Sequence, residues 1–452
     1  MAKIFWQIVI LSFFAFFLSW LVAYKTGLNT LAIQSEDTLP AMFLPVSIIK
    51  DDTMYADKYY ETIKEKYPHP DDKSFEKGLT PFYFKKVGEH YVSAFTLVSG
   101  LLSVPVYFLP LMLGLPVTFE NITFLAHIAS SLIVAFSGGF MYLLLKKHFA
   151  LDGKKALLIT GVYLFGTVNL SMISQALWQH GSLQLFTILG LYFLYEKRWL
   201  WTSFTLGLAV LSRPTAALFV PFLFLVVLYF TKNLRFVPKI LLGLVPVVLF
   251  FFWYNKTFYG DISNQGYASQ IFTEWRGRFP EGFFGLWLSP SKGILIYSPI
   301  FVFSLIGFVM ALKQRKIEYF LYFCIIFLYT MLMGRWKHWY GGYSYGYRMA
   351  SDILPFLTLL LVPFVGSVHF LKFKGVFLML FAVSVLMQII GIVFFDGIWH
   401  GIYDRGFVDT KWLWSVKDSE LVFNVRRVLT KFGLLSKACE VCMNVGNSSE
   451  TV

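Results

Sequence analysis

Two neighbouring acids follow the first apolar segment of the chain. Glu36 and Asp37 lie in a short polar stretch that continues into Thr38-Leu39-Pro40. A carboxylate close to a membrane surface can accept a proton from a hydroxyl nucleophile, so either acid is a candidate catalytic base. Acids at the exit of a membrane helix are also commonly just solvated, and position alone favours that simpler interpretation.

A second group of candidates combines histidine, glutamine and aromatic side chains. His90 and Tyr91 precede a weak apolar stretch, and Trp178, Gln179 and His180 form the turn after the third strongly apolar segment of the chain. If both places face the same side of a membrane, these residues would meet at one water-accessible, substrate-binding site. A single histidine at a membrane interface is more often structural than catalytic, which is the competing interpretation.

Cations set among aromatics and glycines form a third group. Arg213 separates two apolar segments and precedes a proline, Lys292 precedes another apolar segment, and Trp339 and Arg348 belong to an aromatic stretch with a Gly341-Gly342 pair. An arginine in apolar surroundings needs an anionic partner, although snorkelling to the headgroups is an equally good explanation. Lysine and arginine can hold a phosphate, and these three cations are candidates for that task.

The composition indicates which elements must position these residues. The 452 residues are 57% hydrophobic and only 14% charged, with a mean hydropathy of +0.63, which excludes a soluble globular enzyme and a disordered chain. The apolar runs are about 15 to 25 residues long, as a helix that crosses a hydrocarbon core requires. We therefore expect an all-α polytopic membrane protein.

Eleven apolar segments are predicted to span the membrane. A weaker stretch at 97–113 is interpreted as interfacial or re-entrant, because counting it as a span would place the N-terminus on the wrong side. The predicted spans are 4–24, 121–145, 156–173, 181–195, 199–212, 215–231, 236–254, 294–312, 317–334, 351–366 and 374–395. The first is expected to remain uncleaved.

The basic residues predict the orientation. Under the positive-inside rule the segments rich in Lys and Arg are cytoplasmic, namely the N-terminus with Lys3, 146–155, 196–198, 232–239, 313–318 and 369–374. These segments account for nearly all of the net charge of +13, so no nucleic-acid partner is implied.

The same orientation leaves three long pieces outside the cell membrane. They are the first loop, 25–120, with interfacial helices, a second loop, 255–293, and the C-terminal tail, 396–452. We expect a transmembrane domain over 1–395, followed by an outer tail or small domain that contains Cys439 and Cys442. The plasma membrane is the expected location, with the active site and the C-terminus on the outer face.

At these positions the chain resembles the GT-C superfamily of glycosyltransferases that use polyprenyl-phosphate sugars, and is similar to protein O-mannosyltransferases and lipid A aminoarabinose transferases. The resemblance covers residues 1–395. It rests on the order of the acid pair, the proline-containing stretch 97–113, the basic loop 146–155, Ser212-Arg213-Pro214 and the segment from Trp336 to Arg348.

The resemblance implies an inverting transfer of one sugar from a polyprenyl-phosphate carrier to a glycan, lipid or protein acceptor. It implies that Asp37 is the catalytic base, with Glu36 as its competitor, and that Arg213, Lys292 and Arg348 hold the phosphate. Relatives often have a second acid where this chain has Trp178-Gln179-His180, which leaves His180 an orienting role. We expect no metal cofactor, although a divalent cation is compatible with the chemistry.

Two other classes of protein are compatible with the sequence. A flippase for lipid-linked saccharides, or another transporter, would use charged residues within spans, and Asp352 near the start of the tenth span is the main example. A non-catalytic membrane scaffold would leave the clustered cations unexplained.

Overall fold

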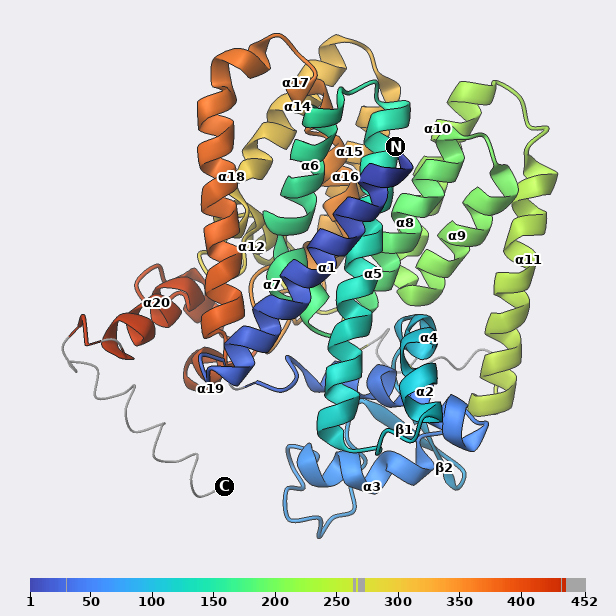
Figure 1. Cartoon of the computed structure of the whole chain (residues 1–452), viewed down its shortest axis with the longest axis vertical. Coiled ribbons are helices and arrows are strands. Elements are labelled where there is room, and N and C mark those ends of the chain that lie inside the picture. The colour runs from blue at the N-terminus through green and yellow to red at the C-terminus, as the bar shows by residue number, and fades with distance from the viewer. Residues whose placement is uncertain (30, 263–265, 267–272, 432, 436–452) are drawn as a thin grey trace.

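The computed structural model describes residues 1–29, 31–262, 266, 273–431 and 433–435, and shows a bundle of helices (Figure 1). The first half contains α1 (Ala2–Lys25), η1 (Glu36–Thr38), α2 (Leu39–Asp51), α3 (Asp57–Lys66), β1 (Phe84–Val87), β2 (His90–Ser93), α4 (Val98–Met112), α5 (Phe119–His148), α6 (Gly153–Phe165), α7 (Val168–Ser171), η2 (Ile173–Gln175), α8 (Gln179–Tyr195) and α9 (Trp199–Ser212). The second half contains η3 (Pro214–Leu218), α10 (Phe219–Thr231), α11 (Val237–Tyr254), the π-helical turn η4 (Asn255–Tyr259), α12 (Phe279–Leu288), α13 (Ile294–Tyr297), η6 (Pro299–Phe301), α14 (Val302–Lys313), α15 (Ile317–Gly334), η7 (Arg348–Ile353), α16 (Leu354–Leu359), α17 (Val362–Val365), α18 (His369–Phe394), α19 (Ile398–Tyr403), η8 (Lys411–Trp414) and α20 (Glu420–Lys431).

The helices confirm a polytopic membrane protein. Within the described residues, seven helices are long and apolar enough to cross a membrane. The pair Gly153–Phe165 and Val168–Gln175, bent by 47°, raises that number to eight if it counts as one span. Helices overlap all eleven predicted spans, but several are short or broken, so the count of eleven remains a prediction.

Glycines allow the helices of the bundle to approach closely. At Gly139 of α5, an added Cβ would meet Phe5 and Val9 of α1 at 2.7 to 2.9 Å. At Gly243 of α11, an added Cβ would clash with the backbone of Leu200 and with Ser203 of α9. Small residues at such contacts are typical of membrane helices, because lipid supplies no hydrophobic force between them and close packing has to hold them together.

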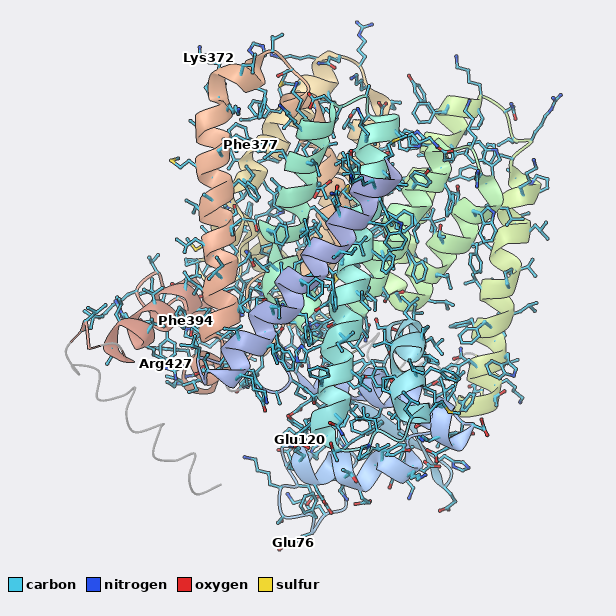
Figure 2. The ribbon with its side chains drawn as sticks, viewed as in Figure 1. Glu76, Glu120, Lys372, Phe377, Phe394 and Arg427 are labelled. Carbon is cyan, nitrogen blue, oxygen red and sulfur yellow. The ribbon has the colours of Figure 1, made fainter. Side chains whose placement is uncertain are left out.

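The predicted basic loops gather at one end of the bundle. Figure 2 shows Lys372 at this end and Glu76 and Glu120 at the other. A cavity of about 640 Å³ at the basic end is lined by residues of several of these loops, among them His148, Lys197 and Lys316. The loops that are grouped by their basic residues therefore also lie together in the structure (Figure 1).

Four helices at the basic end stop in an unusual way. Ala150 after α5, Lys197 after α8, Lys232 after α10 and Arg315 after α14 have φ values of 52°, 58°, 53° and 53°. Glycine is the usual residue for this left-handed backbone, because a Cβ is strained there.

The opposite end carries a layer formed by α2, α3, α4 and a β-hairpin (Figure 1). The helical chain also contains one short hairpin in its described part: β1 pairs antiparallel with β2, with Val87 opposite His90 across a turn at Gly88 and Glu89. The weak apolar stretch forms α4, which is only 15 residues long and packs against α2 and α5. Its length agrees with the prediction that it does not span.

The C-terminal segment packs against the bundle as far as it is described. In Figure 1, α19 and α20 lie at the end of α18 that is nearer to the hairpin layer. Trp399 and Leu413 are buried there, and the Trp399 indole donates to the backbone oxygen of Asp418 at 2.7 Å. Cys439 and Cys442 lie outside the described residues.

Candidate functional site

Asp37 lies at the centre of the candidate site and forms an ion pair with Arg348. The short helix η1 that carries Asp37 starts at Ser35, whose hydroxyl oxygen accepts a hydrogen bond from the Asp37 backbone N–H at 3.4 Å. Pro40 follows in the first turn of α2, where a missing N–H is tolerated. The turn therefore holds the carboxylate beside a guanidinium that comes from 311 positions further along the chain.

Arg348 has contacts on several sides. Its guanidinium carbon lies 4.1 Å from the centre of the Trp178 ring, and its Nη1 donates to the backbone oxygen of Gly341 at 3.2 Å. Its Nε donates to His180 Nε2 at 3.5 Å. A planar guanidinium suits this arrangement, because it can stack on an aromatic face and still donate in plane.

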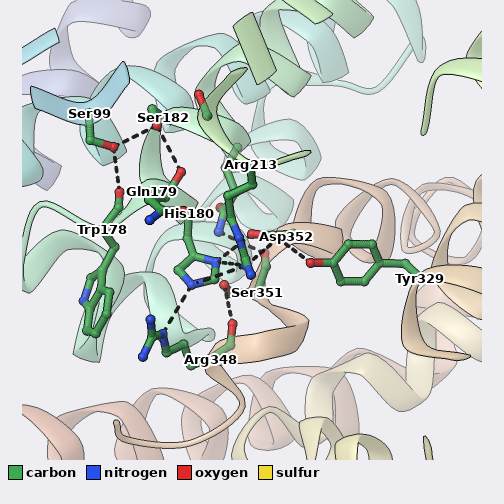
Figure 3. Close-up of polar contacts among 12 residues, drawn as sticks. Ser99, Trp178, Gln179, His180, Ser182, Arg213, Tyr329, Arg348, Ser351 and Asp352 are labelled. Carbon is green, nitrogen blue, oxygen red and sulfur yellow. Dashed lines mark hydrogen bonds and ion pairs between the residues drawn. The ribbon is translucent and has the colours of Figure 1, made fainter. Parts of the chain in front are cut away.

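Arg213 and Asp352 approach the same histidine from its other side (Figure 3). Arg213 Nη1 lies 2.7 Å from Asp352 Oδ2 and 2.8 Å from His180 Nδ1, and that same Nδ1 lies 2.7 Å from Asp352 Oδ1. The Tyr329 hydroxyl donates to Asp352 Oδ2. Asp352 is the anionic partner that the sequence requires for Arg213.

The helix that carries His180 starts at the site. Trp178 is the N-cap of α8 and has no side-chain capping bond, and its ring stacks on Arg348, so the positive end of the helix lies in the same turn as this contact. Ser99 of α4 fixes this turn, because its hydroxyl donates to the Trp178 backbone oxygen at 2.9 Å and lies 2.8 Å from the Ser182 hydroxyl. Cations beside a helix N-terminus form a favourable place for an anion.

The acidic side of the site contains two unlike carboxylates. In the described structure Asp37 is paired with Arg348, whereas the Glu36 carboxylate forms no hydrogen bond or ion pair. Burial raises the pKa of Glu36, and the neighbouring charge of Asp37 raises it further. The two acids therefore differ in how readily each is available to accept a proton.

An apolar groove begins next to Arg213. Its volume is about 650 Å³, and its wall is formed by α9, α10, α11 and the residues that lead into α4. Pro214, the residue after Arg213, belongs to this wall, as does Thr96, whose hydroxyl donates to the Ser212 backbone oxygen at 2.6 Å. The charged cluster and the groove thus share the junction between α9 and η3.

The structure brings several predicted site residues together in one cluster and leaves two of them in the first loop. Asp37, Trp178, His180, Arg213 and Arg348 are linked by direct contacts. Gln179 follows the N-cap residue of α8 in the same turn, and its backbone oxygen accepts from the Ser182 hydroxyl at 3.0 Å.

His90 and Tyr91 instead have partners within the first loop. His90 Nδ1 lies 2.6 Å from Asp57 Oδ2, and the Tyr91 ring stacks on Tyr60 at 3.4 Å. No hydrogen bond or ring contact joins His90 to His180 in the described part of the chain. The hairpin, rather than the charged cluster, therefore accounts for the positions of these two residues.

Lys292 and Trp339 are buried away from the guanidinium cluster. Lys292 Nζ lies 3.2 Å from both carboxylate oxygens of Glu420 and 3.1 Å from His400 Nε2. Burial lowers the pKa of Lys292 and raises that of Glu420, and the charge of each partner opposes the shift. The ring of Trp339 packs over Gly285 of α12.

Two residues of these clusters escaped the sequence analysis. Tyr329 lies within an apolar span, where a tyrosine is unremarkable, and Glu420 is one of several acids in a tail without a motif. Asp352 was noticed only as a charge that would suit a transporter. The available signal was the need of each buried cation for a buried anion.

Comparisons with known proteins give no match, because no family model, no curated protein and no solved structure matches the chain. No group of three or more His, Cys, Asp or Glu side chains among the described residues could hold a metal ion.

Proposed function

We propose that this protein is a membrane glycosyltransferase that moves one sugar from a polyprenyl-phosphate carrier to an acceptor hydroxyl. The observation that carries the proposal is the meeting of Asp37, Arg213 and Arg348 at the start of an apolar groove. A lipid phosphate needs cations for its head and an apolar surface for its chain, and both occur here side by side.

In this proposal the cations hold the donor phosphate. Arg348 and Arg213, with the N-terminus of α8, bind the phosphate oxygens, and the isoprenoid chain lies in the groove between α9, α10 and α11. The charge that develops on the phosphate as it leaves is stabilised by the same groups.

The reaction is a single displacement. The acceptor oxygen attacks the anomeric carbon, the bond from that carbon to the phosphate oxygen breaks, and the phosphate leaves with the electron pair. The acceptor proton passes to Asp37. Arg348 forms an ion pair with Asp37, and in this proposal a donor phosphate that takes over Arg348 releases the carboxylate for this task.

The proposal extends to the fold and its setting. In this proposal the protein is a GT-C-like transferase with eleven spans in the cell membrane, its N-terminus in the cytoplasm and its site on the outer face. Support comes from the position of the Asp37 cluster. Asp37 lies in η1, directly before α2 of the hairpin layer, and His180 and Arg213 lie at the ends of α8 and α9 that are nearer to this layer than to the basic end (Figure 1).

The test is release of polyprenyl phosphate by purified protein in lipid nanodiscs. A panel of polyprenyl-phosphate monosaccharides is supplied together with cell-envelope extract as a source of acceptors. We expect wild-type protein to release polyprenyl phosphate and Asp37→Asn to release it at least about 100-fold more slowly, because removal of a general base has an effect of this size. Asp51→Asn, which alters a carboxylate that pairs with Lys58 in the same loop, is the matched control.

The Glu36→Gln variant separates the two acids. Full loss in Glu36→Gln with activity kept in Asp37→Asn would assign the base to Glu36 and leave Asp37 as the anchor of Arg348. Release by none of the donors from wild-type protein would reject the transferase proposal.

A lipid-saccharide flippase is the second candidate. It is favoured by the buried Asp352, which lies in the 3-10 turn η7 directly before α16. Asp352 pairs there with Arg213, the C-cap residue of α9. Charges at broken helices are common in transporters. Under this alternative, Asp352→Asn abolishes lipid movement across vesicles, and Asp37→Asn leaves that movement intact.

A further inference from the structure

The loop from Gly341 to Arg348 carries the main cation of the site but has little rigidity of its own. Gly341, Gly342 and Gly346 have φ values of 87°, 60° and 63°, which glycine adopts readily. Glycine also loses more conformational freedom on folding than any other residue. The loop also has no regular secondary structure before Arg348. Something outside the loop must therefore fix its shape.

Glu420 supplies one of these fixed points. One of its carboxylate oxygens accepts the backbone N–H of Gly346 at 3.0 Å and the Tyr297 hydroxyl at 2.8 Å. The other oxygen faces Lys292 Nζ at 3.2 Å. Glu420 is the first residue of α20, and its own N–H donates to the Ser291 hydroxyl at 3.3 Å.

Lys292 supplies another. Its ammonium donates to the backbone oxygen of Ser344, and the Ser344 hydroxyl donates to the Gly341 oxygen at 3.0 Å. That same Gly341 oxygen accepts from Arg348 at 3.2 Å. A chain of direct contacts therefore runs from the C-terminal helix to the guanidinium that pairs with Asp37.

The Lys292–Glu420 end of this network is enclosed. Lys292, Glu420 and His400 are each 0% exposed, and Lys292 Nζ also lies 5.3 Å from the Trp399 ring centre. A buried ion pair of this kind adds little net stability over an apolar pair of the same size, because desolvation offsets the attraction. Its value must lie in the geometry that it imposes.

We propose that Glu420, held by Lys292, is a positioning residue: it fixes the Gly341–Arg348 loop from the C-terminal segment and so sets the position of Arg348 against Asp37. The proposal rests on the proposed function for the identity of the ligand, a polyprenyl phosphate. The fixing of the loop itself is independent of that identity.

Two double variants isolate the role of Glu420 without leaving a buried charge. Lys292→Met with Glu420→Gln, the Met/Gln variant, keeps an oxygen that can accept from Gly346 and Tyr297. Lys292→Met with Glu420→Met, the Met/Met variant, removes that oxygen. The control is Arg427→Gln, which breaks the other ion pair of α20, to Asp396, without touching the loop.

Two measurements are made on all three proteins and on wild type in nanodiscs. The first is hydrogen exchange of peptides that cover 341–348, and the second is binding of a polyprenyl phosphate without sugar. We expect the Met/Met variant to exchange faster in this loop and to bind about tenfold more weakly, the equivalent of one lost hydrogen bond to a charged group. The Met/Gln variant, which among the contacts that fix the loop loses only that of Lys292 to Ser344, should be affected less than the Met/Met variant, and Arg427→Gln should stay within about twofold of wild type.

The outcomes separate the two proposals. Equal exchange in the Met/Met and Met/Gln variants would overturn the positioning role. Faster exchange in the Met/Met variant with no change in binding would show that the loop is fixed but does not position the phosphate ligand, and would also overturn it. Absence of binding by wild-type protein, with the exchange contrast present, would reject the ligand and hence the proposed function, while the fixing of the loop would stand.

Discussion

The loop from Gly341 to Arg348 contacts two ionic clusters that differ in exposure. At one, the side chains of Asp37 and Arg348 are 17% and 16% exposed, and Arg213 of the same cluster precedes Pro214 in the wall of the groove. At the other, Lys292 and Glu420 are completely buried. An ion pair that solvent reaches can exchange one partner for a ligand, whereas an enclosed pair whose polar atoms are satisfied can only hold structure.

The comparison also explains why Arg213 and Arg348 suit a ligand better than Lys292 does. A guanidinium has five N–H donors, so it can keep one structural partner and still offer a face to a phosphate. The ammonium of Lys292 uses its donors on Glu420, on the Ser344 oxygen and toward His400. A cation with no free donor is a poor phosphate ligand.

The largest effect is expected from breaking the closed cluster on one side. Lys292→Met leaves the Glu420 carboxylate buried without its counter-ion, which should cost about 3 to 5 kcal/mol of unfolding free energy. Thermal unfolding in detergent measures it, with Lys337→Met at the part-exposed pair to Glu274 as control. An unchanged melting temperature would show that the closed cluster does not stabilise the fold.

A smaller effect, on binding and not on stability, is expected at the open cluster. Arg348→Lys keeps the charge but loses the stacked, planar donor over Trp178, and should weaken polyprenyl-phosphate binding about tenfold. Arg335→Lys is the control, because Arg335 lies over Phe279 outside the cluster. Equal affinity in both variants would remove Arg348 from the phosphate site.

The groove sharpens the comparison because the open cluster adjoins it through Pro214. Ala217 lines it, and Ala217→Trp should lower affinity for long polyprenyl phosphates several-fold while short-chain analogues are less affected. Leu225→Trp on the outer face of α10 is the matched control. A loss of affinity that does not depend on chain length would place the lipid chain elsewhere.

The smallest effect concerns Glu36. Its raised pKa means that the folded protein binds a proton there more tightly than the unfolded chain, so this group lowers stability as pH rises through the folded pKa. Glu36→Gln should therefore melt slightly above wild type near neutral pH and equal to it below about pH 4, where the carboxyl is protonated in both states. Melting curves across this range test the sign.

The sequence is sufficient to predict the helices but not their breaks. Continuous apolar runs fix α1, α5 and α18 to within a few residues, because only a helix satisfies its backbone in lipid. The hairpin at 84–93 was not predicted, because His90 and Tyr91 were considered only as site residues and not as part of a strand. The two-residue turn at Gly88-Glu89 was the available signal.

The candidate site was predicted as a set of residue types and not as a set of contacts. Asp37 and Arg348 were both named, yet nothing local to either indicates the other. Lys292 shows the reverse: its surroundings in sequence matched those of Arg348, and only the three-dimensional structure reveals that Glu420 occupies it. Pairing across more than a hundred positions depends on how the bundle packs.

At the basic end of the bundle, three of the residues that end a helix in the left-handed conformation are also basic. Each of them meets two requirements at one position. A glycine there would relieve strain of about 1 kcal/mol or more per residue, but it would carry no charge. A lysine or arginine ends the helix, complements the negative end of its dipole and marks the side of the membrane on which the loop must stay. At Lys197, Lys232 and Arg315 a single residue thus has both the left-handed backbone and the charge, whereas Ala150 after α5 has the same backbone without a charge.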